Sequence, residues 1–134
     1  MRKIRVLIGK VGLDGHDVGA RVIARGLLDH GMEVIYTGLR RTPEQIARAA
    51  VDEDVDLVGI SILSGAHLTL LPRVRAAIDA LGGSDILLMA GGVIPQEDIS
   101  VLLNAGVSRV FLSGTTTQDV IDYVHRACAE KLAS

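Results

Sequence analysis

The sequence predicts an α/β fold with a doubly wound parallel sheet, and three observations support this. Short apolar runs alternate with segments of helical periodicity from one end of the 134-residue chain to the other. The runs are apolar at consecutive positions, as in strands that are covered on both faces. The segments between them are long enough for the crossover helices that parallel strands require. No linker or low-complexity tract interrupts this alternation, so we expect residues 1–134 to form a single domain.

Five βα units account for the whole chain. The predicted strands are residues 4–9, 33–36, 57–62, 86–90 and 109–112. The predicted helices are residues 18–30, 43 to about 53, 68–81, 96–105 and a last helix that begins near residue 116. A chain of this size with five such units favours the flavodoxin-like (Rossmann-like) strand order 2-1-3-4-5. In that order ligands bind beyond the carboxyl ends of strands one and three, where the strand order reverses.

Local signals delimit the helices. Thr42 precedes Pro43 and stands three residues before Gln45, which is the pattern of a capping box with proline at the first helical position. Pro72 is expected in the first turn of the third helix, where its missing N–H does no harm. Gly106 is expected to end the fourth helix. The expected buried residues are Val22, Ile23 and Leu27 in the first helix, Leu71, Val74, Ile78 and Leu81 in the third, and Val120, Val124 and Cys128 in the last.

Composition excludes several classes of function. The 14 basic and 16 acidic residues give a net charge of −2, so no basic face for nucleic acid is expected. No apolar stretch approaches the length of a membrane span, and the amino-terminal residues do not resemble a signal peptide. We therefore expect a cytoplasmic protein that binds neither nucleic acid nor membrane. Cys128 is the only cysteine, and its place on the apolar side of the last helix favours a packed thiol over a catalytic one.

Glycine, serine and threonine gather where four of the predicted strands end. These ends are the 10–19 loop, residues 61–65, Gly91-Gly92 and Ser113-Gly114-Thr115. At any single position ordinary turn chemistry explains such a residue. Together, small side chains at adjacent strand ends predict a slot lined by hydroxyl groups, which a long polar appendage of a cofactor could fill.

The 10–19 loop carries the most specific signal. His16 stands two residues after Asp14 in a glycine-rich segment that follows the first strand. An imidazole whose second nitrogen is held by a carboxylate is a well-oriented metal ligand, and glycines let the backbone approach a bulky group. A histidine in a polar loop is usually only solvated, so the residues around it and downstream decide the interpretation.

These residues resemble a known family. Asp14-Gly15-His16-Asp17-Val18-Gly19 resembles the D-x-H-x-x-G signature of cobalamin-binding domains, Ser61-Ile62-Leu63 their S-x-L element, and Gly91-Gly92 their paired glycines. The resemblance implies that His16 is the lower axial ligand of cobalt, that Asp14 holds its other nitrogen and that Lys10 contacts this carboxylate. It also implies that the nucleotide tail of the cofactor enters the slot beside the sheet. The cofactor-binding residues expected on this pattern are Lys10, Asp14, Gly15, His16, Asp17, Gly19, Ser61, Leu63, Ser64, Gly91, Gly92, Gly114 and Thr115.

Asp17 and His67 each have more than one interpretation. Asp17 is also typical of a helix N-cap. His67 follows the third strand and could reach the cofactor side or a partner. His30 and His125 lie on predicted helices and are expected at the surface.

Longer strings indicate a subfamily. Residues 10–17 resemble K-V-G-x-D-G-H-D of the acyl-CoA mutases, residues 65–70 resemble the G-x-H-L-T-L of methylmalonyl-CoA mutase, and residues 91–95 are similar to the same enzyme. Val18 and Ser113 depart from the mutase pattern, which has arginine and proline there. The sequence lacks both a helical cap before the first strand and a TIM barrel. The resemblance therefore implies the small subunit of an adenosylcobalamin-dependent acyl-CoA mutase, with methylmalonyl-CoA as favoured substrate; the alternatives are 2-hydroxyisobutyryl-CoA mutase and a cobalamin carrier without mutase activity.

The resemblance further implies a radical rearrangement of the acyl carbon skeleton in a heteromer. A large TIM-barrel subunit would bind the acyl-CoA and supply the catalytic residues, so this chain alone is expected to bind cobalamin and turn nothing over. Signalling receiver domains share the fold, but they need aspartate at the end of strand three, where this chain has Ser61. A flavin carrier would need a serine- and threonine-rich phosphate loop after the first strand, and the 10–19 loop is not of that kind.

Overall fold

Five parallel strands form one sheet in the order β2-β1-β3-β4-β5, as predicted. The computed structural model describes residues 3–10, 18–37, 41–62, 67–92, 94–112 and 114–133. The strands are β1 (Arg5–Lys10), β2 (Glu33–Tyr36), β3 (Leu57–Ile62), β4 (Leu87–Gly92) and β5 (Arg109–Phe111). The helices are α1 (Val18–Asp29), α2 (Pro43–Asp52), α3 (His67–Ala80), the 3-10 helix η1 (Gln96–Asp98), α4 (Ile99–Asn104) and α5 (Thr117–Ala133).

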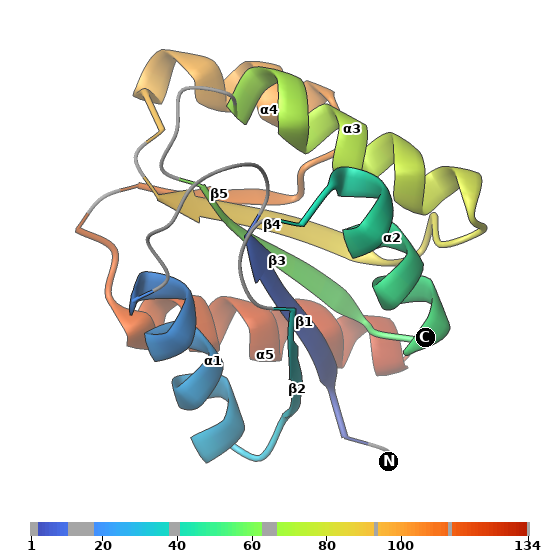
Figure 1. The fold of residues 1–134 in the computed structure, drawn as a ribbon. Coiled ribbons are helices and arrows are strands. Elements are labelled where there is room, and N and C mark those ends of the chain that lie inside the picture. Colours follow the sequence, from blue (N-terminus) through green and yellow to red (C-terminus); the bar gives the residue numbers. More distant parts are fainter. Residues whose placement is uncertain are drawn as a thin grey trace.

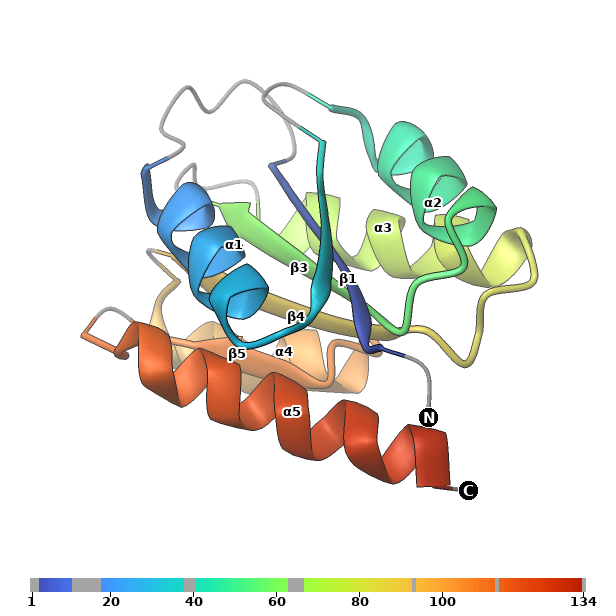
Figure 2. The ribbon, with the colours of Figure 1, turned by 90° about the horizontal axis from the view of Figure 1, so that it is seen from below.

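The sheet lies between two layers of helices. Helices α1 and α5 cover one face, and α2, α3 and α4 cover the other (Figures 1 and 2). Alternate residues of each strand enter different cores: Val6 of β1 belongs to the α1/α5 side, and its neighbour Leu7 belongs to the opposite side. Both side chains are fully buried. Since the strands are parallel, their carboxyl ends all lie at one edge of the sheet, and the predicted site residues belong to that edge.

Capping residues begin α2, where the sequence predicts them, and they also begin α5. The Gln45 amide donates to the Thr42 hydroxyl at 3.1 Å, and the Thr42 amide donates to the Gln45 side chain at 2.9 Å. The same reciprocal pair joins Thr116 and Asp119, at 3.1 and 3.3 Å. Each pair satisfies backbone donors that the first turn of a helix leaves free.

Pro72 lies inside α3, and the prediction that it falls in the first turn was wrong. The helix begins at His67, so Pro72 is its sixth residue. A proline there cannot donate to the carbonyl of Leu68 four residues earlier. Leu68 is 41% exposed, so its carbonyl is on a part of the helix where water can replace the missing donor.

The expected buried face of α1 was also partly wrong. Val22 is 49% exposed, whereas Leu27 is fully buried and Ala20 is 2% exposed. The stripe that packs on the sheet contains alanines because α1 lies close to α5. A methyl group on Gly26 would come within 2.9 Å of side-chain atoms of Ile121 in α5.

The predicted boundaries differ most at β4 and at the fourth helix, and most other ends differ by one residue. Gly91 and Gly92 are the last two residues of β4, where the prediction had them after the strand. The predicted helix 96–105 is the 3-10 helix η1 followed by α4. In the described parts of the chain, no helix has both the length and the apolar character needed to cross a membrane.

Candidate cofactor-binding site

One row of residues crosses the sheet near its carboxyl edge. Lys10 pairs in register with Ser61, Ser61 with Gly91, and Gly91 with Phe111. Strand alternation puts Ser61 and Gly91 of this row on the α1/α5 face, because Phe111 belongs to the core on that face. Four of the five strands therefore bring one residue each to a single line, and three of those residues were predicted to bind cofactor.

The two residues in the middle of this row are only partly buried. Ser61 and Gly91 are half-buried, whereas their strand neighbours Ile60 and Ala90 are 2% and 1% exposed. A methyl group built on Gly91 would find its nearest described neighbours in Phe111, at 3.6 and 3.7 Å, which is ordinary contact. We call the pair formed by Ser61 and Gly91 the Ser61–Gly91 shelf. It can seat an extended group against the sheet with a hydroxyl beside it.

Gly92 is required by its backbone. Its φ is +130°, which L side chains rarely adopt, and an added Cβ would overlap the carbonyl oxygen of Ile62. Ile62 and Gly92 are partners in register at the ends of β3 and β4. The lack of a side chain thus lets the two strand ends approach each other beside the shelf.

The end of β5 is a tight turn. Gly114 has a φ of +94°, and nothing lies within 4 Å of a Cβ built there. The backbone N–H and the hydroxyl of Thr115 both donate to the carbonyl of Leu112, at 3.1 and 2.7 Å. Both residues were predicted to bind the cofactor, and the structure brings them to the same edge as the shelf.

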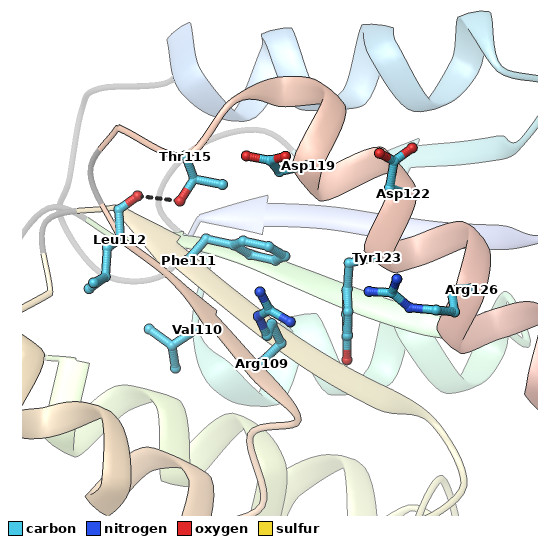
Figure 3. A pocket seen from close by; sticks show the side chains of 9 residues that line it. All are labelled: Arg109, Val110, Phe111, Leu112, Thr115, Asp119, Asp122, Tyr123 and Arg126. Atoms are coloured by element: carbon cyan, nitrogen blue, oxygen red, sulfur yellow. Dashed lines mark hydrogen bonds between the residues drawn. The ribbon is translucent and has the colours of Figure 1, made fainter.

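A hollow of about 390 Å³ adjoins this turn on the outer side of β5 (Figure 3). Thr115 lines one end of it. The guanidinium of Arg109 lies 5.2 Å from the ring centre of Phe111 and 5.5 Å from that of Tyr123. Asp119, Asp122 and Arg126 of α5 complete its polar lining. This hollow was not predicted from the sequence; Phe111 and Tyr123, two of only three aromatic residues in the chain, were the available signal.

His67 is held by a residue that the sequence analysis did not single out. It is 5% exposed, and its Nε2 lies 2.7 Å from the Oδ2 of Asp98. Its Nδ1 is buried and has no hydrogen-bond partner among the described residues. His30 and His125 are exposed, as expected.

Several predicted residues lie outside the described residues, namely Asp14, Gly15, His16, Asp17, Leu63 and Ser64. The described chain fixes where their segments start and end. The histidine loop leaves the sheet at Lys10, one strand away from Ser61, and it enters α1, whose first turn contains Gly19. The segment that contains Leu63 and Ser64 joins β3 to His67.

The residues fit a cofactor with a long appendage. An open shelf, a hydroxyl at Ser61 and a glycine pair at Gly91 and Gly92 are what close approach of an extended polar group to a sheet edge requires. The shelf lies on β3 and β4, next to the β1/β3 pair where the strand order reverses.

The chain is similar to known proteins over nearly its whole length. The chain is 48% identical over 128 residues to the 2-hydroxyisobutanoyl-CoA mutase small subunit of Aquincola tertiaricarbonis, with 96% of this chain and 94% of that protein covered. It is 45% identical over 137 residues to the mitochondrial methylmalonyl-CoA mutase of Mus musculus, and there it spans only 18% of the relative's length.

A solved structure shares the fold. A cobalamin-binding protein from Desulfitobacterium hafniense superposes with a TM-score of 0.81 at 21% identity, over 93% of this chain and 59% of that one. The family model described as the B12 binding domain matches residues 4–122, which include every strand and the predicted ligand loop. The chain therefore belongs to the family of B12-binding domains.

Proposed function

We propose that this chain is the cobalamin-binding small subunit of an adenosylcobalamin-dependent acyl-CoA mutase, an isomerase. The observation that carries the proposal is the match to the 2-hydroxyisobutanoyl-CoA mutase small subunit, which spans 94% of that subunit at 48% identity. Similarity of this kind over a whole subunit supports the same role in the assembly. The match to the mouse methylmalonyl-CoA mutase supports the same chemistry, since there the domain is part of a longer mutase chain.

The residues have separate tasks in this proposal. His16 would hold the cobalt, Asp14 would orient its imidazole, and Lys10 would balance the charge of that carboxylate. The Ser61–Gly91 shelf, with Gly92, Gly114 and Thr115 beside it, receives the nucleotide tail. Support comes from the register, because the histidine loop leaves the sheet at Lys10, which pairs with the shelf residue Ser61.

The chemistry is divided between two chains. When bound, adenosylcobalamin supplies a cobalt–carbon bond whose homolysis starts the radical rearrangement of the acyl group. This chain binds and orients the cofactor and holds the axial imidazole. A large TIM-barrel subunit binds the acyl-CoA and excludes water above the carboxyl edge of the sheet, and we place the complex in the cytoplasm. This chain contributes no catalytic residue for the substrate, so it is inactive alone.

Axial ligation is tested by electron paramagnetic resonance of reduced cobalamin bound to the ¹⁵N-labelled protein. If an imidazole of the protein ligates cobalt, the nitrogen splitting is the doublet of ¹⁵N, whereas ligation by the cofactor's own base gives the triplet of ¹⁴N. We expect the doublet in the wild type and in His125→Ala, and its loss in His16→Ala. A triplet in the wild-type complex would contradict the proposed ligand.

Substrate is tested in the complex with the large subunit. The sequence strings favour methylmalonyl-CoA, whereas the subunit-length match favours 2-hydroxyisobutyryl-CoA. Because the acyl group contacts the other chain, both thioesters are offered to the reconstituted complex and product is followed by chromatography. Turnover of either one supports the mutase assignment. Tight cobalamin binding without turnover of any acyl-CoA would favour the cobalamin carrier.

A further inference from the structure

Met89 lies directly below the Ser61–Gly91 shelf. One row nearer the amino edge of the sheet, Ile8 pairs with Gly59 and Gly59 with Met89. This row faces the same way as the shelf, since strand residues two apart share a face. The side chain of Met89 crosses over Gly59: a Cβ built on Gly59 would lie 2.7 Å from its Cε and 3.5 Å from its Cγ.

The two rows differ in how closely other side chains pack above them. Among the described residues, no atom lies closer than 3.6 Å to a methyl group built on Gly91, whereas above Gly59 the space is already filled by Met89 and by the Cδ1 of Ile8. Met89 is 4% exposed and Ile8 is 3% exposed, so this filling is part of the core. The open layer over the shelf therefore ends at the Met89 side chain.

We infer that Met89 is a specificity-determining residue that sets how far the lower base of a corrinoid can reach along the sheet. This inference rests on the proposed function. A flat heteroaromatic base at the end of an extended nucleotide is the part of the ligand that reaches deepest, and the Met89 thioether and methyl group are soft, apolar contacts for it. Methionine has the length to cover Gly59, and glycine at position 59 leaves it the space to do so.

The variant Gly59→Ala should displace the Met89 side chain without changing either residue of the shelf. In Gly59→Ala the new methyl group overlaps the Met89 Cε. Met89 belongs to the buried α1/α5 core, so we expect the displaced end of its side chain to shift toward the shelf. Met89→Ala removes the obstacle, and the double variant Gly59→Ala/Met89→Ala puts the added methyl group into the space that Met89 vacates.

The experiment measures dissociation constants of the full chain for adenosylcobalamin and for adenosylcobinamide, which lacks the nucleotide tail. We expect Gly59→Ala to weaken adenosylcobalamin about tenfold, the size of a typical overpacking penalty. The double variant should recover most of this loss. Adenosylcobinamide binding should change less than about twofold, because this ligand has no lower base that could reach Met89.

Gly83→Ala is the matched control. Its added methyl group meets equally close side-chain atoms, at 2.8 Å from Ile78 and 2.9 Å from Ile86, but Gly83 lies before β4 at the opposite edge of the sheet. It should affect stability without weakening adenosylcobalamin selectively. Circular dichroism and thermal melting verify that each variant is folded.

The deciding comparison is the double variant. If Met89→Ala fails to rescue Gly59→Ala in folded protein, or if both corrinoids weaken together, Met89 does not set the reach and the inference is overturned. A wild-type chain that binds neither corrinoid would instead overturn the proposed function, so the two failures are distinguishable.

Discussion

The imidazole of His67 and the carboxylate of Asp98 form a part-buried pair, with 2.7 Å between Nε2 and Oδ2. His67 is the first residue of α3, which follows β3, and Asp98 closes η1, which follows β4. Asp98 occupies the N-cap position of α4, yet its side chain makes no capping bond. The pair therefore ties together the two segments that leave the carboxyl ends of β3 and β4.

Removal of this tie should destabilise the protein. Asp98→Ala leaves the Nε2 of a 5% exposed imidazole without its partner, and an unsatisfied buried polar group costs about 1–3 kcal/mol. Urea unfolding followed by circular dichroism measures the loss. Asp98→Asn keeps an oxygen in place and should lose less. His125→Ala on the exposed side of α5 should stay within about 0.5 kcal/mol of wild type, and equal values for Asp98→Ala and His125→Ala would refute the role of the pair.

Gly92 and Gly82 allow a matched comparison of backbone strain alone with backbone strain plus a steric overlap. Both have positive φ, +130° and +87°, but only at Gly92 would a Cβ overlap a backbone atom, the Ile62 carbonyl oxygen. Gly82→Ala should cost about 1–2 kcal/mol, the strain of the backbone conformation alone. Gly92→Ala adds a collision with rigid backbone and should cost more than about 3 kcal/mol. It should also abolish adenosylcobalamin binding, whereas Gly82→Ala should retain it; thermal unfolding and a binding titration decide.

Strand positions and helix starts were predictable because they depend on local chemistry. Strands β2 and β3 have the predicted bounds, since continuous apolar runs between turns leave little freedom. The capping box of Thr42 and Gln45 was found for the same reason, because all of its bonds lie within four residues. The strand order followed from chain length and unit count, and it is the observed one.

What failed depends on tertiary packing. Val22 is apolar but 49% exposed, whereas α1 comes closest to Ile121 of α5 at Gly26, and neither fact can be seen in the local pattern. The partner of His67 is 31 residues away, and no local pattern identifies Asp98 as that partner. Gly91 and Gly92 lie at the carboxyl edge of the sheet, as predicted, but only the register shows which of them belongs to the shelf and which meets Ile62.

Arg75 and Arg73 lie two residues apart on α3, and their ion pairs should contribute differently to the free energy of unfolding. Arg75 is 9% exposed, and its guanidinium donates to the carbonyls of Ile86 and Gly83, at 2.6 and 3.1 Å, as well as to Asp79. Arg73 contacts Glu44 through side chains that are 53% and 61% exposed.

Lysine cannot reproduce the fork of donors at Arg75, so Arg75→Lys should lower the free energy of unfolding by about 1–3 kcal/mol. Arg73→Lys should change it by less than about 0.5 kcal/mol, because solvent screens the exposed pair. Chemical denaturation of both variants in one buffer checks this. Similar losses in the two would mean that the buried carbonyls find other donors.

Cys128 should be a structural thiol. It is fully buried and packs in the α1/α5 core with Leu27 and Val124. A thiol reagent can therefore reach it only when α5 detaches, so the reaction should be slower than that of the unfolded chain by a factor that tracks the free energy of opening. Timed reaction with a chromogenic disulfide measures this, and addition of urea should restore the rate of a free cysteine. Fast reaction in native buffer would mean that α5 opens readily, and it would support a reactive role for Cys128, which the packing of this core argues against.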